Sequence, residues 1–191
     1  MFRDLTREEL TLFKRESNKW GLYPFFKNKL IVIKEENLGG NKENNKLLFL
    51  ITENLKKFIF YPSIYASGMF LGSLNNKKFY LSLSFLFFVS KFGNNYPFVV
   101  VSDEAEKLVL YGRDILGGSI IEFSPDLKEN LLVIIFNKNK EPLGIGRSRF
   151  SNSLIQQKGR ITVSTLMDLG AYLREENNKY QYGLDTSLFL D

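Results

Sequence analysis

The sequence of 191 residues contains no cysteine and no histidine. Without cysteine, the chain forms no disulfide framework and no thiolate–metal site. Without histidine, it lacks the commonest general base and the commonest transition-metal ligand. Ser–His–Asp and Cys–His catalysis are therefore excluded. We expect a protein that is not an enzyme, with no catalytic residues, no metal and no cofactor.

The sequence also lacks a long apolar run. Its strongest one, residues 79–90, is 12 residues long and has lysines at both ends. A helix that crosses a membrane needs about 20 apolar residues, so this run is expected in a core. The first ten residues, MFRDLTREEL, are charged and unlike a secretion signal. We therefore expect a soluble, intracellular protein that does not bind membranes.

Charge is distributed unevenly along the chain. The 26 Lys and Arg outnumber the 21 Asp and Glu, and the net charge of +5 permits nucleic-acid binding without requiring it. Residues 1–95 carry 15 basic and 8 acidic side chains, whereas residues 96–191 carry 11 and 13. Within that acidic half, residues 142–167 contain no acid and four cations. This stretch is a candidate surface for a polyanion.

The first half alternates helical and strand patterns. Thr6 and Glu9 fit a capping box, so a helix with Leu10, Phe13 and Trp20 on its apolar face is expected to end near Gly21. Strands are predicted at residues 29–34, 46–51, 68–74 and 77–83, and helices at residues 53–61 and 84–93. The stretch 38–46 between the first two strands is expected to be a loop.

The pattern changes after the break at residues 94–97. Short strands are predicted at residues 97–102, 119–123, 130–136, 141–146 and 159–165, with a short helix or irregular turn at 107–116. The fold class is α+β. An α/β domain with an antiparallel sheet and flanking helices is expected over residues 1–95, a small β-rich domain over residues 96–176, and a tail over residues 177–191.

The stretch GRDILGGS, residues 112–119, differs by one residue from a phosphate-binding loop. Gly118 stands where the lysine is required, and a strand-like run follows instead of a helix. The glycines are therefore expected to make tight turns or close backbone approaches. Asp114 resembles the aspartate of a pseudouridine synthase loop, but the chain is too short for that catalytic domain. Asp103, Glu104 and Glu106 are expected to begin a helix rather than to bind a metal.

Basic and hydroxyl side chains gather in the acid-free stretch. If residues 159–165 form a strand, Ile161 and Val163 point into the core and the alternate side chains share the other face. Such a face suits an RNA backbone, although an ordinary solvated face explains it equally well. The predicted RNA-binding residues are Arg147, Arg149, Lys158, Arg160, Thr162 and Ser164.

Several segments together resemble one family. LVLYGRDILGGSI resembles the helix-and-turn signature of PUA domains, which are RNA-binding modules. PLGIG followed by GRITVSTLMDLGAYLREE resembles the end of that module in the large-subunit (60S) ribosome biogenesis factor called nuclear import protein seven, and in its archaeal relatives. DLTREEL, YASGMFLGSL and KKFYLSLSFL in the first half agree. The resemblance covers residues 4–176.

The resemblance implies a pre-PUA domain followed by a PUA pseudobarrel. It implies a non-catalytic RNA-binding protein that acts in pre-rRNA processing and large-subunit biogenesis. The implied partners are pre-rRNA and pre-ribosome assembly proteins, and a monomer is expected. The protein would be cytoplasmic in an archaeon and nucleolar or nuclear in a eukaryote. Arg160 matches the family's RNA surface and Lys158 is adjacent, whereas Ser164 and Met167 depart from its basic pattern.

Two other classes of function stay open. In a protein–protein adaptor, the basic first half would dock an acidic partner and RNA contact would be incidental. In an RNA-modifying enzyme, the PUA domain would only bind the substrate. The missing histidine, cysteine and S-adenosylmethionine-type glycine loop argue against the enzyme.

Overall fold

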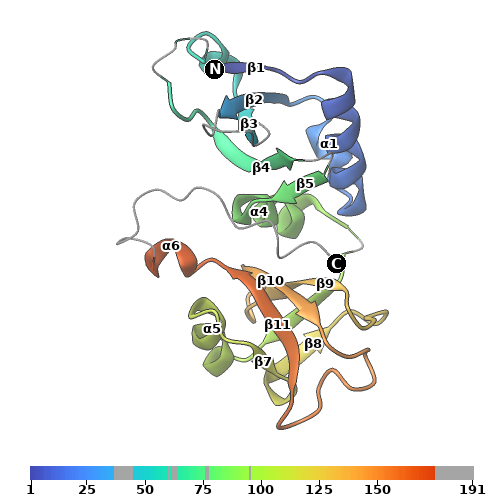
Figure 1. Ribbon diagram of the computed structural model, residues 1–191. Helices are drawn as coiled ribbons and strands as arrows, with labels where there is room; N and C mark the ends of the chain where they lie inside the picture. The colour runs from blue at the N-terminus through green and yellow to red at the C-terminus, as the bar shows by residue number, and fades with distance from the viewer. Residues whose placement is uncertain (37–44, 60, 62–63, 76–77, 95, 175–191) are drawn as a thin grey trace. The chain divides into compact units, whose positions relative to one another are not determined.

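The computed structural model describes residues 1–36, 45–59, 61, 64–75, 78–94 and 96–174 (Figure 1). The chain divides into two compact units, Met1–Asn94 and Asn95–Asp191. No helix among the described residues is long and apolar enough to cross a membrane. The architecture is of the α+β class, as predicted, with one sheet in each unit.

The N-terminal unit contains a five-stranded antiparallel sheet, sheet A, in the order β1-β2-β3-β4-β5. Its strands are β1 Phe2–Asp4, β2 Leu30–Glu36, β3 Asn45–Ile51, β4 Met69–Asn75 and β5 Lys78–Leu81. Its helices are α1 Arg7–Lys19, α2 Tyr23–Phe26, α3 Glu53–Lys56 and α4 Leu83–Phe92. Most of the loop predicted at 38–46 lies outside the described residues.

The helix α1 begins with the predicted capping box. The Thr6 hydroxyl accepts a hydrogen bond from the Glu9 N–H, and the Glu9 carboxylate accepts one from the Thr6 N–H at 2.9 Å. Phe13 and Trp20 are buried as predicted, and Phe13 packs edge-on against Phe79 of β5. Leu10 was predicted on the apolar face, but it is 40% exposed.

The opposite face of sheet A is covered by the segment that follows α3. Val32, Leu47 and Phe49 on that face form a core with Ile59, and Leu55 and Ile64 pack against it. The helix predicted over residues 53–61 is confirmed only at Glu53–Lys56, and single turns follow it. The described residues of this segment, the strap, thus form single turns instead of a helix.

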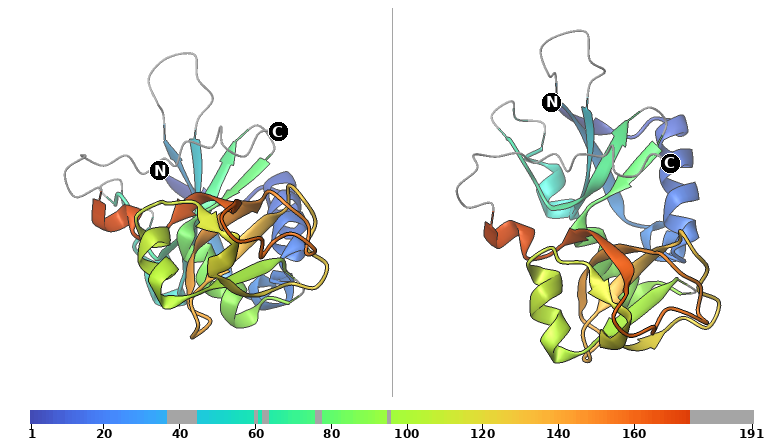
Figure 2. Two further views of the ribbon diagram at one scale, coloured as in Figure 1. Left: turned by 90° about the horizontal axis from the view of Figure 1, so that it is seen from below. Right: turned by 60° about the horizontal axis from the view of Figure 1, so that its bottom comes forward.

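The C-terminal unit contains the six-stranded sheet B, which curls into a nearly closed barrel (Figure 2). Its order is β7-β11-β10-β9-β6-β8, and only β6 and β9 pair in parallel. Its strands are β6 Phe98–Val101, β7 Ile115–Leu116, β8 Ile120–Phe123, β9 Leu132–Phe136, β10 Pro142–Ser148 and β11 Ile161–Asp168. Its helices are α5 Asp103–Leu110, α6 Ala171–Arg174 and the 3-10 turn η1 Gly117–Ser119.

The two edges of sheet B are joined by η1, because that turn connects β7 directly to β8. Asp103 and Glu104 lie in the first turn of α5, as predicted for a helix start. Within the described part of the chain, no three Asp or Glu side chains are grouped as a metal site would require. The sequence reading of residues 107–116 missed β7, which is only two residues long.

Candidate nucleic-acid interface

The strand β11 lies between β7 and β10 and brings the two motifs of the C-terminal half together (Figure 1). Ile115 of β7 is the register partner of Val163, and Leu116 is the partner of Ile161. The Gly117 N–H donates to the Arg160 carbonyl at 2.9 Å. The GRDILGGS stretch therefore contains the edge strand β7, which runs antiparallel to β11.

Arg149 crosses this strand from the end of β10 toward β7. Its backbone N–H donates to the Thr162 carbonyl at 2.8 Å. Its side-chain Nε donates to Ser164 Oγ at 2.6 Å, and its Nη2 donates to Asp114 Oδ2 at 2.9 Å. Asp114 Oδ1 also accepts the Thr165 N–H at 3.0 Å. Asp114 thus fixes β7 to β11 and neutralises Arg149.

The side chains of the other three predicted cations make no hydrogen bond or ion pair with any residue that the structure describes. Arg147 is half-buried on β10, where it is the register partner of Ser164. Lys158 and Arg160 are exposed in the turn directly before β11, and the Lys158 side chain lies against Gly118. The structure therefore places Arg147 and Arg149 beside Ser164, and Lys158 and Arg160 beside η1, along one stretch of the same strand.

The predicted alternation of β11 is wrong at its first two residues. Ile161 was expected in the core but is 39% exposed, and Thr162 was expected on the RNA face but is fully buried. A bulge explains both, because the register shifts between Ile161 and Val163 against β7. The Thr162 hydroxyl has no hydrogen-bond partner among the described residues. Thr162 is therefore too deep to contact RNA in this conformation.

The predicted site residues do not include Arg113, which contacts β11, or Tyr111, which is exposed nearby in the sequence. The Arg113 carbonyl accepts the Thr165 hydroxyl at 2.8 Å, and the Arg113 side chain is exposed. Tyr111, at the C-cap of α5, is 69% exposed. Both residues lie in the stretch that was read as one helix or turn. Only the pairing of β7 with β11, which is not local in sequence, brings Arg113 to the basic strand.

The glycines of GRDILGGS have a structural role. A Cβ atom on Gly117 would lie 2.5 Å from the Gln157 carbonyl oxygen and 2.8 Å from the Ile155 carbonyl oxygen. Only glycine allows this close approach between η1 and the segment before β11. Gly112 has a φ of +71°, which favours glycine at the turn after α5. These are the tight turn and close approach that the sequence predicts, in a loop without the lysine that phosphates require.

The DLGAYLR motif fixes the end of α5 to the end of β11. The Arg174 guanidinium binds the Asp168 carboxylate through two hydrogen bonds of 3.0 and 2.8 Å. It also donates to the Leu110 carbonyl, the last residue of α5. Gly170 packs directly against that carbonyl and leaves no room for a Cβ atom. Arg174 is thus held in a structural role that caps the helix.

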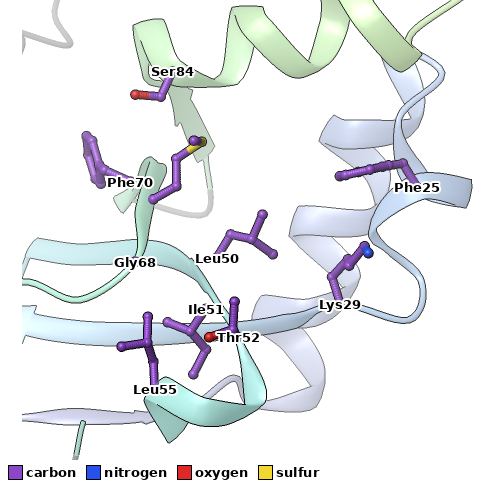
Figure 3. Close-up of a pocket in the computed structure, with 10 residues that line it drawn as sticks. Phe25, Lys29, Leu50, Ile51, Thr52, Leu55, Gly68, Phe70 and Ser84 are labelled. Carbon is purple, nitrogen blue, oxygen red and sulfur yellow. The ribbon is translucent and has the colours of Figure 1, made fainter. Parts of the chain in front are cut away.

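The N-terminal unit contains an open pocket of about 630 Å³ (Figure 3). Leu50, Leu55 and Phe70 make it mainly apolar, and Lys29 is the one charged residue among those that line it. The Lys29 ammonium lies 5.3 Å from the centre of the Phe25 ring.

Residues 97–177 match the family described as the UPF0113 PUA domain. A UPF0113 protein of Archaeoglobus fulgidus is 29% identical over 92% of this chain and 95% of its own length. A UPF0113 protein of Aeropyrum pernix is 30% identical over 59% of each chain. A conserved PUA domain protein from Thermoplasma acidophilum has a TM-score of 0.62 at 10% identity, over 91% of this chain and 97% of that one.

These similarities show a PUA domain of the UPF0113 type in the C-terminal unit, and relatives in archaea. The predicted PUA-like barrel is confirmed. The likeness to the Thermoplasma acidophilum structure extends over both units, so the pairing of an α/β unit with a PUA domain is a shared fold. The PUA domain is a fold of the RNA-binding type.

Proposed function

We propose that this chain, whose C-terminal unit is a PUA domain, is a non-catalytic RNA-binding protein of large ribosomal subunit biogenesis and pre-rRNA processing. The observation that carries the RNA-binding proposal is the set of cations along β11. Arg147, Lys158 and Arg160 make no ion pair with any described residue, so their charges are available to phosphates. The role in ribosome biogenesis is supported by the resemblance of the PLGIG and DLGAYLR segments to that family.

The proposed mode of binding is contact with the RNA backbone. Free guanidinium and ammonium groups attract phosphates whatever the base sequence. The Arg149 side chain is hydrogen-bonded to Ser164, and Asp114 neutralises its charge. Arg149 and Ser164 would therefore position β11 more than they attract RNA. We therefore expect weak sequence preference and a strong dependence on salt. The relatives are archaeal, so the site of action would be the cytoplasm of an archaeal cell.

The test compares two double variants of the full chain. Lys158→Ala with Arg160→Ala removes two free cations from β11. The control, Lys138→Ala with Lys140→Ala, removes two lysines of the same unit that are paired with Asp103 and Glu122. Each neutralised phosphate contributes about −0.7 to the log–log salt slope for single-stranded RNA, so the first variant should flatten the slope by about 1.4. An unchanged slope and affinity would show that β11 is only a solvated strand.

The role in ribosome biogenesis needs a cellular measurement. Crosslinking in cells, followed by sequencing of the bound RNA, should recover precursors of large-subunit rRNA. Recovery of unrelated RNA would contradict the ribosomal role while leaving RNA binding intact.

A protein–protein adaptor is the second candidate, and the open apolar pocket of the N-terminal unit favours it. Such pockets suit apolar side chains of a partner. An adaptor would crosslink to protein alone, and the β11 variants would leave its partner bound.

A further inference from the structure

We propose that the N-terminal unit carries a second RNA-contacting surface, on which unpaired bases stack against the rings of Phe58, Tyr61 and Tyr65. This inference rests on the proposed function and adds a second mode of contact to it. Backbone contact by the PUA domain would set affinity for any polyanion. Ring stacking would select RNA whose bases are not already paired.

The three rings are unusually exposed for their size. Phe58 is 55% exposed, Tyr61 is 61% and Tyr65 is 60%, and all three lie within eight residues. Aromatic side chains bury more surface than most others when they join a core, so three exposed rings within eight residues of the chain suggest a surface that binds something. Each base of an unpaired strand has a flat face that such a ring can cover.

Buried or partly buried residues lie near the three rings along the chain. Ile59 is 1% exposed within the core of sheet A, and Leu55 and Ile64 pack against the same core. Backbone hydrogen bonds from Phe58 to Leu55 and from Tyr61 to Phe58 close successive turns. The Phe58 ring is therefore presented next to a residue held in the core, which lowers the entropic cost of stacking a base.

The charge around the rings favours a polyanion. The Lys34 ammonium lies 3.6 Å from the centre of the Tyr65 ring, and Lys56 and Lys57 precede Phe58. No Asp or Glu occurs in the sequence between Glu53 and Asp103, whereas five lysines do. Lys34 is buried and is followed by Glu35 and Glu36, so the exposed positive charge comes from the segment of the rings itself, where lysines precede Phe58 and no acid follows Glu53. Exposed rings in such a segment have the composition of surfaces that bind single-stranded nucleic acid. A surface that binds an apolar protein partner would not require these lysines.

The experiment uses the full chain and two fluorescent RNA probes. One is a 12-nucleotide oligo(A), and the other is an abasic oligomer with the same number of phosphates. Both probes offer the same backbone, but only the first offers bases. The test variant is Tyr61→Ala with Tyr65→Ala. Tyr61→Phe with Tyr65→Phe keeps the rings and serves as the rescue.

Phe87→Ala is the matched control for lost aromatic surface. Phe87 is 47% exposed on α4, and its ring also lies near a lysine, at 5.3 Å from the Lys91 ammonium. Thermal melting checks that each variant folds. Tyr61→Leu with Tyr65→Leu provides an apolar surface without aromatic faces, in case the alanine variant is unstable.

We expect the Ala and Leu variants to lose about tenfold or more in affinity for oligo(A), since stacking contributes about 1–3 kcal/mol per base. Affinity for the abasic oligomer should not change, and the Phe variant and the Phe87→Ala control should bind like the parent. Equal affinity of the parent for both probes, or ring variants that bind oligo(A) normally, would overturn the stacking surface. The β11 variants lower affinity for both probes, so the two proposals fail separately.

Discussion

Asp114 shows how one residue serves both the fold and the candidate site. Its carboxylate accepts the Thr165 N–H through one oxygen and binds the Arg149 guanidinium through the other. The first contact fixes the edge strand β7, and the second lowers the positive potential of β11. Asp114 therefore limits the positive charge that the candidate RNA surface can present.

Replacing Asp114 by asparagine should separate these two roles. The asparagine Oδ1 can still accept the Thr165 N–H, but the negative charge beside Arg149 is lost. We expect RNA affinity to rise and the salt slope to steepen by about 0.7, because one more cation becomes available. Asp126→Asn, an exposed acid of the same unit, is the control for net charge. A slope equal to that of the control would show that Arg149 does not face RNA. The measurement is affinity at several salt concentrations.

The two adjacent glycines of η1 should respond differently to alanine. In Gly117→Ala the new methyl group would collide with backbone atoms of Gln157 and Ile155, so we expect a loss of about 2–3 kcal/mol in the free energy of unfolding. In Gly118→Ala the nearest atom is the flexible Lys158 Cγ, at 3.4 Å, and stability should change by less than about 0.5 kcal/mol. Urea unfolding measures both. Equal losses would contradict the close approach at Gly117.

At the scale of elements, α1 and β11 show which features the sequence can predict. The capping box of α1 needs only Thr6 and Glu9, which are three residues apart, so local pattern was sufficient. The bulge in β11 depends on pairing with β7. Because β7 is far from β11 along the chain, no local sequence pattern indicates the bulge. Alternation therefore placed Thr162 and Ile161 on the wrong faces. Arg160 and Lys158 are exposed as expected, since turn residues precede the bulge.

The start of α1 should make stability depend on acid pH. Hydrogen bonds from Arg3, followed by one from Lys46 and one from the Thr6 N–H, hold the pKa of Glu9 well below its usual 4.5. A lowered pKa in the folded state means that the ionised form stabilises the fold above about pH 4.5. That stabilisation is lost as pH falls below this value. The free energy of unfolding should therefore decrease steeply between pH 5 and pH 3.

Glu9→Gln tests this dependence. The variant should be about 2 kcal/mol less stable at pH 7, because Arg3 and Lys46 lose their shared partner. Its stability should also change less between pH 5 and pH 3 than that of the parent. Glu8→Gln, at an exposed position of the same turn, should behave like the parent. A parallel loss of stability in parent and Glu9→Gln would assign the acid response to other groups.

At the scale of the whole molecule, the chain consists of two compact units with different sheets. The sequence analysis predicts the boundary from turn residues at 94–97 and from the change to short strands. It also predicts a small β-rich second unit, because five of its six strands have their own hydrophobic runs, whereas the barrel is implied only by the family resemblance. It could not find β7, whose two residues carry no pattern of their own.

Separate expression of residues 1–95 and 96–176 should give two folded proteins. Each unit has its own hydrophobic core, one under the strap of sheet A and one inside the barrel. Circular dichroism and cooperative thermal unfolding of each fragment are the measurements. Two unfolded fragments that regain structure only when mixed would show that the halves share one core.

The pairing of β7 with β11 also sets when the PUA domain becomes complete during synthesis. Thr165 donates to Asp114 across 51 residues of chain, so the edge strand leaves the ribosome well before its partner. At roughly 5–20 residues per second, that interval lasts about 3 to 10 seconds. The N-terminal unit has time to fold meanwhile, whereas the barrel stays open along one side. Arg160 directly precedes β11, so the candidate RNA surface is not assembled until β11 has left the ribosome and paired with β7.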